Sequence, residues 1–425
     1  MTRIGKAVLA LALAPALLVS TALAQSAELP AGVVRTLPDR AGAVAAIDAQ
    51  PRVARARGEQ AAANARARGR QRGPHDWIAG GQWQERDARS GGRFDEWELS
   101  LQRGVRLPGK AALDRSIADL EIEIGEDTLA DARHVAAIDL LHAWAEWLTA
   151  SELSRLAREA VVLAVRDLEA TALRLDAGHA ANAEHDAAVA ANARARRVLE
   201  DAALREDEAR LALSLRYPQL HLPAEAPRIT VPDEPVDWEA WAVRATTVSH
   251  DITLAEGRAA LADRRAERAR LDQRADPSIG VRAMSELGGE ETVLGVFFSV
   301  PLGAGSRRAV AEEEAALATA SWADAEASRL EATVQARTLA RRAALQADAW
   351  ALAAAAAAAQ TREAERLTQG HALGGVDLAD LLAARRRATE AAMAELDARA
   401  IAFTSAASLL LDAHAYWIDD GRHAE

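Results

Sequence analysis

Cysteine is absent from the 425-residue sequence, and aromatic residues are scarce. The first absence excludes disulfides, Cys-ligated zinc, iron–sulfur clusters, thiol nucleophiles and a lipid anchor on an N-terminal cysteine. Aromatic residues make up only 4% of the chain, although hydrophobic residues make up 50%. Alanine and leucine therefore supply the apolar fraction, which is typical of long, closely packed helices rather than of a β-sandwich.

Positive charge and long apolar runs are also limited. Lys and Arg total 51 against 63 Asp and Glu, for a formal charge of −12. This balance argues against a general nucleic-acid-binding protein, because phosphate binding needs concentrated positive charge. After residue 24 no stretch approaches the ~20 uninterrupted apolar residues of a spanning helix. If the mature chain crosses a membrane, it must do so as β-strands.

The first 24 residues have the pattern of a secretory signal peptide. Arg3 and Lys6 precede an apolar run over residues 7–20, and Ala22-Leu23-Ala24 supplies a small-x-small cleavage site. An N-terminal membrane anchor is the alternative, but the run is short and Pro15 interrupts it. We therefore predict an exported protein.

The remaining chain divides into two similar halves about 200 residues apart, which indicates a tandem structural duplication. Each half has a helix-favouring stretch (residues 41–70 and 238–274), a proline break, two strand-like runs and a very long helical stretch. Leu175–Ala180 lies opposite Leu367–Ala372. We predict a first repeat over residues 25–216, a proline-bearing linker over 217–235, a second repeat over 236–418 and a tail over 419–425.

Four short strands are expected, two in each half. They are His75–Gln84, Phe94–Gln102, Ser278–Ser285 and Val293–Val300, and apolar residues alternate with small or polar ones along them. An apolar face opposite a polar face suits strands of a barrel with lipid outside and water inside. It also suits a hairpin of a soluble protein that packs one face against a core. Four strands cannot close a pore barrel, for which eight is the usual minimum, so membrane strands would have to be pooled between subunits.

The helical stretches are unusually long. Residues 111–177 contain no proline and one glycine, Gly125, and would span roughly 100 Å at about 1.5 Å per residue. Return stretches are predicted over residues 183–215 and 376–412. A free-standing coiled coil is the alternative, but sustained leucine heptads are absent, and the alanine content favours many helices packed side by side.

Signatures of enzymes and of metal sites are missing. The sequence has no phosphate-binding Gly-x-x-x-x-Gly-Lys-[Ser/Thr] loop, no Gly-x-Ser-x-Gly elbow and no His-Glu-x-x-His motif. We expect no enzymatic activity and no cofactor. His179 and His371 occupy matching places in the two halves, but His185 would not share a helix face with His179, so no metal site is predicted.

In their order and spacing, these features resemble the TolC-type outer-membrane efflux proteins, over about Thr36 to Tyr416. Ser299–Ala309 resembles the family's exit from a strand into the second long helix. Arg366–Gly370 together with Val376–Arg385 resembles its periplasmic turn and return helix. Val105–Lys110 resembles a motif of the cobalt–zinc–cadmium efflux branch.

The resemblance implies a mainly α-helical protein with a small β portion. Three copies would pool four strands each into a twelve-stranded outer-membrane barrel, and their duplicated helical hairpins would form an α-barrel across the periplasm. This homotrimer would be a passive duct for substrates such as divalent heavy-metal cations, delivered by a periplasmic adaptor and an inner-membrane pump. The alternative is a periplasmic adaptor or scaffold, which should carry one hairpin among several β-rich modules.

The resemblance also assigns candidate site residues. Asp377 and Asp380 share one helix face and match the family's paired aspartates at the closed periplasmic entrance, where three copies would form acidic rings. Two solvated aspartates near a helix N-terminus are the alternative. Gly178, His179, Gly370 and His371 lie at the predicted hairpin tips, where an adaptor would make contact.

Overall fold

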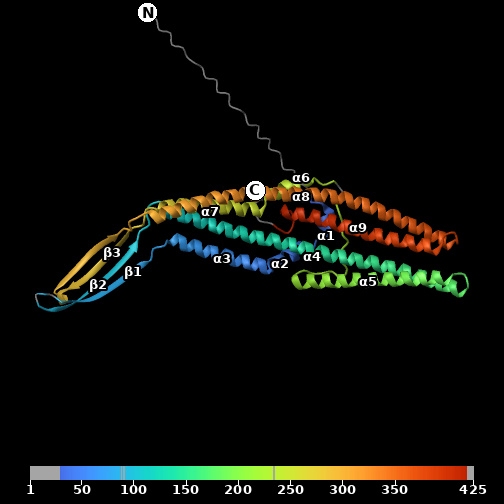
Figure 1. The fold of residues 1–425 in the computed structure, drawn as a ribbon, viewed down its shortest axis with the longest axis horizontal. Helices are drawn as coiled ribbons and strands as arrows, with labels where there is room; N and C mark the ends of the chain where they lie inside the picture. Colours follow the sequence, from blue (N-terminus) through green and yellow to red (C-terminus); the bar gives the residue numbers. More distant parts are fainter. Residues whose placement is uncertain (1–28, 88, 90, 233–234, 419–425) are drawn as a thin grey trace, which may run out of the picture.

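The computed structural model describes residues 29–87, 89, 91–232 and 235–418. The predicted signal peptide and C-terminal tail lie outside this part of the chain. The described residues form a long rod, with a β-sheet at one end and the turns of two helical hairpins at the other (Figure 1). Both predicted classes of element, long helices and short strands, are therefore present.

The elements follow one another in the same order in the two halves. The first half contains α1 (Ala31–Thr36), α2 (Arg40–Asp48), α3 (Pro51–Arg72), β1 (Trp77–Asp87), β2 (Arg93–Gly104), α4 (Lys110–Asp176) and α5 (Asn182–Arg216). The second contains α6 (Trp238–Thr247), α7 (His250–Asp272), β3 (Ser278–Glu286), the 3-10 turn η1 (Leu287–Gly289), β4 (Glu291–Ser299), α8 (Gly305–Ala372) and α9 (Leu378–Asp412).

The helix-favouring stretch that opens each half forms helices, but each stretch is interrupted once. Pro51 is the first residue of α3, a position that suits proline because the N–H it lacks would have no partner in the helix. In the second half the break falls before His250, after the extended residue Ser249. The two breaks lie at matching places, so each half has a short helix followed by one of 22 or 23 residues.

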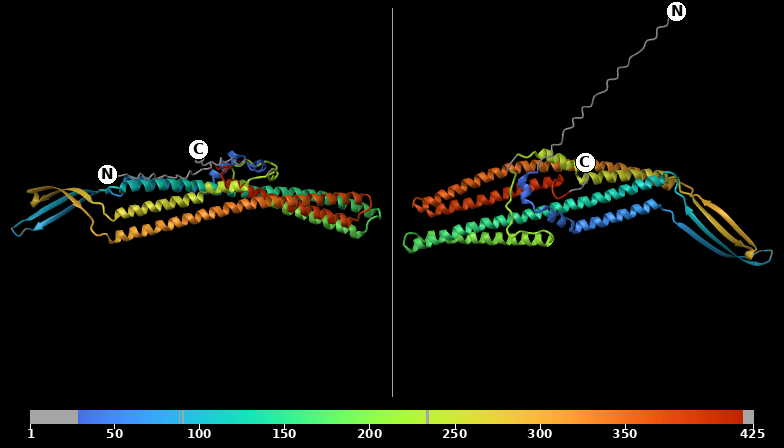
Figure 2. Two further views of the ribbon diagram at one scale, coloured as in Figure 1. Left: turned by 90° about the horizontal axis from the view of Figure 1, so that it is seen from above. Right: turned by 180° about the vertical axis from the view of Figure 1, so that it is seen from behind.

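The four strands form one antiparallel sheet in the order β1-β2-β3-β4. Its central pair, β2 with β3, joins the two halves, with Leu101 opposite Val281. The sheet extends the rod at an angle to the helices (Figures 1 and 2). Strands from distant parts of the sequence therefore meet at one end of the molecule.

The helices pack as two hairpins, α4 with α5 and α8 with α9, and α3 and α7 lie along the halves of α4 and α8 nearest the sheet (Figure 2). Gly125 is the single glycine of α4, and a Cβ at this position would lie 3.2 Å from the Cβ of Ala63. It therefore allows α3 to approach α4 closely. No helix among the described residues is both long and apolar enough to cross a membrane.

The hydrophobic core lies at the waist of the rod, where α1, α2, α4, α6 and α9 meet the linker between the halves. Trp144, Trp147, Leu148, Phe403 and Leu410 are buried there. Packing is thus concentrated midway between the sheet and the hairpin turns, and the two ends are more exposed.

Buried polar contacts hold the linker against this core. The Glu152 carboxylate, which is 1% exposed, accepts a 2.7 Å hydrogen bond from the N–H of Ile229 and pairs with Arg399 at 2.7 Å. Beside it, the hydroxyls of Thr36 and Thr230 lie 2.8 Å apart. The linker therefore connects the two halves as part of the waist.

Candidate functional site: hairpin tips and strand arm

The tip of the α4–α5 hairpin is a tight glycine turn. Gly178 has a φ of +78°, a conformation that glycine adopts without steric cost. Its N–H donates to the Leu175 carbonyl at 2.9 Å, and the N–H of His179 donates to the Arg174 carbonyl at 2.7 Å. These two bonds form a Schellman motif, which ends α4 and reverses the chain.

The α8–α9 tip repeats this geometry, but at Gly374 rather than at Gly370. Gly374 also has a φ of +78°, and its N–H donates to the His371 carbonyl at 2.9 Å. The N–H of Gly375 donates to the Gly370 carbonyl, also at 2.9 Å. The sequence match of Gly178 with Gly370 was therefore wrong by one helical turn, and Gly374 is the equivalent turn residue.

Gly370 lies in the last turn of α8, where it has a packing role. A Cβ at this position would lie 2.7 Å from Cγ2 of Val376, so a larger residue would push the returning chain away. The Nδ1 atom of the adjacent His371 lies 2.7 Å from the Val376 carbonyl oxygen. Gly370 and His371 thus shape the turn from inside the helix.

The two tips touch through Arg174 and His371. A guanidinium nitrogen of Arg174 lies 3.4 Å from Nε2 of His371, and another donates to the His179 carbonyl at 3.3 Å. The structure therefore brings His179 and His371 to neighbouring tips. Their imidazole rings are half-buried or exposed, at the end of the rod opposite the sheet.

Asp377 and Asp380 lie together at the start of α9. Asp377 precedes the helix without capping it through its side chain, and Asp380 is in the first turn. Both are exposed, and within the described part of the chain neither carboxylate has a hydrogen-bond or ion-pair partner. The helix N-terminus favours their negative charge. In a single chain they are thus open to solvent or to a neighbouring molecule.

The corresponding start of α5 is different. Glu184 occupies the position equivalent to Asp380, and its carboxylate lies 3.5 Å from the N–H of Ala181 and 3.6 Å from Arg174. The Glu184 carboxylate of the first tip is therefore held within the chain, unlike that of Asp380.

A buried ion pair links the two hairpins below the tips. Arg385 of α9 pairs with Asp167 of α4, and it also donates to the Thr368 hydroxyl at 3.3 Å. On the more exposed side of α9, Arg387 pairs with Glu363 of α8 at 2.8 Å. Arg385 and Arg387 therefore form contacts between helices.

At the other end of the rod, one face of the sheet is apolar and exposed. In register across it lie Ala79, Leu101, Val281 and Val296 in one row and Gly81, Leu99, Ala283 and Leu294 in the next. Leu294 and Val296 are 81% and 77% exposed. The opposite face carries polar residues, among them Gln82, Gln84, Glu98, Ser100, Gln102 and Arg282.

Aromatic residues bound the apolar face along the strand direction. Trp77 and Phe298 lie in the row nearest the helices, and Trp83 faces Trp97 in the distal row. Six residues of β1 separate the rows, or roughly 20 Å at 3.3 Å per residue. This is close to the apolar band of about 25 Å, flanked by aromatic girdles, on strands that face lipid.

A buried ionic network joins the sheet to the helices. Lys110, which is 1% exposed, donates from Nζ to Asp276 at 2.7 Å and to the Arg274 carbonyl at 2.7 Å, and it pairs with Asp272 at 2.9 Å. Asp114 accepts from Arg106 at 2.9 Å and from Arg268 at 2.8 Å. Lys110 and Arg106 follow β2, whereas Asp272 and Asp276 precede β3, so these contacts fix both central strands.

Asp276 is the acceptor at the centre of this network. Its carboxylate takes hydrogen bonds from Lys110 and from the N–H of Leu107 at 3.1 Å, and it lies 2.8 Å from Nε2 of His75. Burial alone would raise the pKa of this carboxyl, but the hydrogen bonds from Lys110, His75 and Leu107 outweigh it and lower the pKa to about 2. Sequence reasoning missed this role of Lys110, since Asp276 is far away in the sequence.

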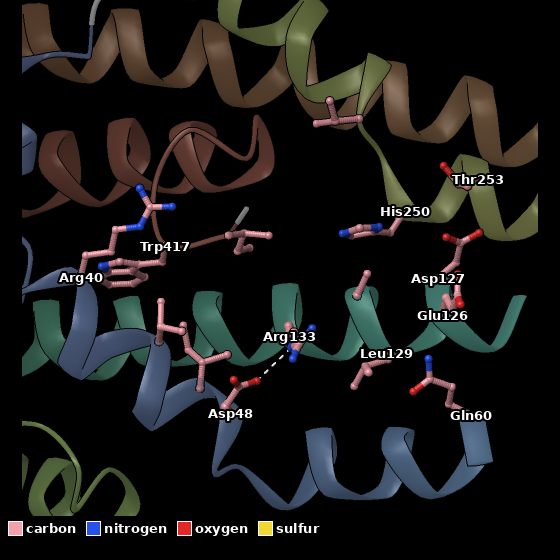
Figure 3. A pocket seen from close by; sticks show the side chains of 15 residues that line it. Arg40, Asp48, Gln60, Glu126, Asp127, Leu129, Arg133, His250, Thr253 and Trp417 are labelled. Carbon is pink, nitrogen blue, oxygen red and sulfur yellow. Dashed lines mark hydrogen bonds and ion pairs between the residues drawn. The ribbon is translucent and has the colours of Figure 1, made fainter. Parts of the chain in front are cut away.

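Figure 3 shows a cavity of about 560 Å³ at the waist, between α2, α4, the start of α7 and the segment after α9. Asp48 and Arg133 form a 2.9 Å ion pair on its wall, and Leu129 and Trp417 add apolar surface. The described lining contains no serine, cysteine or lysine.

Comparison with known proteins identifies the fold. No protein-family model and no curated protein sequence matches the chain. Among solved structures, the outer-membrane channel OprN matches with a TM-score of 0.74 and 17% identity, covering 92% of this chain and 97% of OprN. The outer-membrane protein VceC of Vibrio cholerae matches with a TM-score of 0.71 and 18% identity, covering 89% of this chain and 97% of VceC.

CusC, described as forming a transmembrane channel, matches with a TM-score of 0.71 and 15% identity, covering 91% of this chain and 95% of CusC. At these identities the likeness establishes the fold. The chain has the fold of the TolC-type outer-membrane channels, as the resemblance predicted. OprN and CusC are described as channels.

The ionic network predicts a defined pH dependence of stability. Because the pKa of Asp276 is lowered from 3.8 to about 2, its contribution is present above about pH 5 and is lost as the pH falls toward 2. Asp276→Asn should lower the thermal unfolding midpoint at pH 7, through a loss of at most about 2 kcal/mol. The difference in unfolding midpoint between this variant and the wild type should become smaller below pH 4.

The matched control is Asp119→Asn, which alters an exposed carboxylate on α4, nine residues after Lys110. Thermal unfolding of the detergent-solubilised protein from pH 7 to pH 2.5 would measure both gaps. A gap for Asp276→Asn that stays constant with pH would show that its ionisation does not stabilise the junction.

Proposed function

We propose that this protein is the outer-membrane channel of a tripartite efflux system, a passive duct that spans the outer membrane and extends into the periplasm. The observation that carries the proposal is the four-stranded arm, whose exposed face is apolar and bounded by aromatic residues. A soluble protein rarely exposes such a surface. The fold shared with outer-membrane channels supports the same function.

A trimer would meet the physical requirements of this arm. In the described sheet, β1 and β4 are the outer strands, and each leaves one edge without a strand partner. Unpaired backbone groups are too costly in hydrocarbon, so the edges must pair with other copies. Two or more copies reach the usual minimum of eight strands. We favour three copies and twelve strands, by analogy with the TolC-type family.

The hairpin tips are the proposed contact with the rest of the system. Gly178, His179, Gly370 and His371 lie at the end of the rod farthest from the sheet, where a periplasmic adaptor could bind. An inner-membrane pump, proposed to be proton-driven, would supply the energy through this adaptor. An N-terminal signal peptide would direct the chain to export.

The proposed cargo is divalent metal cations. Support comes from the likeness of Val105–Lys110 to a motif of the cobalt–zinc–cadmium branch, although Arg106 and Lys110 also serve the junction. Deleting the gene should raise sensitivity to cobalt, zinc or cadmium more than to detergents or dyes. The opposite pattern would assign the channel to multidrug export.

Substitutions in the four-stranded sheet test whether its apolar face inserts into the membrane. Val281→Lys with Val296→Lys places two charges side by side on the apolar face, and each lysine should cost about 2–4 kcal/mol in lipid. The double variant should be lost from the outer-membrane fraction. The control, Gln82→Lys with Gln102→Lys, adds the same charge to the polar face and should still insert.

Equal recovery of both double variants in the outer membrane would show that the apolar face does not contact lipid. If the wild-type protein itself fractionates with soluble periplasmic proteins, a periplasmic adaptor or scaffold becomes the better assignment.

Replacing the two aspartates at the α8–α9 tip tests their proposed role in a gate. We propose that Asp377 and Asp380 from three chains surround one narrow axis and attract cations. Asp377→Asn with Asp380→Asn should change the conductance in planar bilayers and weaken block by multivalent cations from the periplasmic side. The helix turn should persist, because neither carboxylate is needed for packing.

The control, Asp201→Asn with Asp207→Asn, removes the same charge from the exposed face of α5 away from the tip and should conduct like wild type. If the tip variant conducts and is blocked as wild type is, the constriction lies elsewhere while the channel assignment stands.

A further inference from the structure

Three histidines far apart in the sequence meet at the waist of the rod. His134 belongs to α4, His250 begins α7, and His414 follows α9. The ring centroids lie 5.8 Å apart for His134 and His250, 5.6 Å for His134 and His414, and 4.6 Å for His250 and His414. These are not the histidines that the sequence placed in matching positions. Only the folded chain brings them together.

Acidic groups share the small cavity that these rings line, which has a volume of about 90 Å³. Asp131, Asp251 and Asp412 contribute to the lining. Three carboxylates beside three imidazoles favour a cation over an anion in this cavity.

The hydrogen bonding of His134 leaves one ring nitrogen available. Its Nε2 lies 3.2 Å from Oδ1 of Asp412, so Nε2–H donates to this carboxylate when the imidazole is neutral. Nδ1 is then the atom with the lone pair, and it is buried without a hydrogen-bond partner among the described residues. Metal-binding histidines commonly have this arrangement, one nitrogen held by a carboxylate and the other on the ion.

The spacing of the rings also suits a shared ion. Three imidazoles at a metal–nitrogen distance of 2.0–2.1 Å around a tetrahedral ion would have centroids about 5 Å apart. The observed separations of 4.6–5.8 Å bracket this value. Among the described residues, no group of three possible ligands already presents its donor atoms in metal-binding geometry. Binding would therefore require the rings to turn until their nitrogen atoms converge.

We propose that His134, His250 and His414 form a binding site for one zinc-like divalent transition-metal ion. Imidazole ligands favour Zn²⁺, Co²⁺, Ni²⁺ or Cu²⁺ over Mg²⁺ and Ca²⁺, which prefer oxygen. Water or the Asp131 carboxylate can complete the coordination. The bound ion would tie together α4, the start of α7 and the segment after α9. The site is independent of the proposed cargo, because it lies at the waist and not at the tips.

The test uses the mature protein in detergent, produced without a polyhistidine tag. Calorimetric titration with Zn²⁺ should give one ion per chain, with a dissociation constant of about 10 µM or tighter. His134→Ala and His414→Ala should each weaken binding about tenfold or more. The matched control, His142→Ala, removes an exposed histidine two turns further along α4 and should bind like wild type.

Zinc X-ray absorption of the wild-type protein provides a readout that does not depend on any variant folding. Scattering from two or three imidazole ligands is expected. Wild-type protein that binds no Zn²⁺ would overturn the proposal. So would folded His134→Ala and His414→Ala variants that bind as tightly as wild type, or a spectrum with oxygen ligands alone.

Discussion

An open sheet with an apolar face is the constraint on which the proposed assembly depends. β1 and β4 expose backbone edges, and the outward face presents leucine, valine and aromatic side chains. Water is a poor solvent for that face, and hydrocarbon is a poor solvent for those edges. Both requirements are met together only when several copies join their edges into a closed cylinder with lipid outside. The proposed oligomer and the proposed duct both rest on this one surface.

The helices have to position the strands for such closure, and the junction network provides the connection. Lys110, Asp276 and their partners hold the exit of β2 against the entry of β3 in a place with little solvent. Buried ion pairs of this kind fix the relative positions of the segments they join more reliably than they raise the free energy of unfolding. The linker held by Glu152 and the core around Trp147 then join the halves at the waist. The hairpins beyond the waist are less buried, as expected of surfaces that contact other molecules.

Local patterns predicted most of the elements, and long-range contacts account for what was missed. Alternation identified all four strands, and the lack of proline identified α4 over nearly its full length. The interruption before His250 has no proline to mark it, and Gly370 was mistaken for the turn residue because glycine also serves where a neighbour, here Val376, comes close. The pairing of Lys110 with Asp276 and the meeting of His134 with His250 and His414 depend on tertiary structure, which no spacing along the chain reveals. The aspartates of the α9 tip were found by resemblance, and their role in a gate stays a prediction.

The central claim is that several copies of this chain form one transmembrane conduit. The most direct measurement is the mass of the mature protein purified from outer membranes, determined in detergent by light scattering with correction for bound detergent, together with the conductance of the same fraction in planar bilayers. The account predicts a trimer that opens discrete ion-conducting pores. A monodisperse monomer, or a trimer that never conducts, would contradict it.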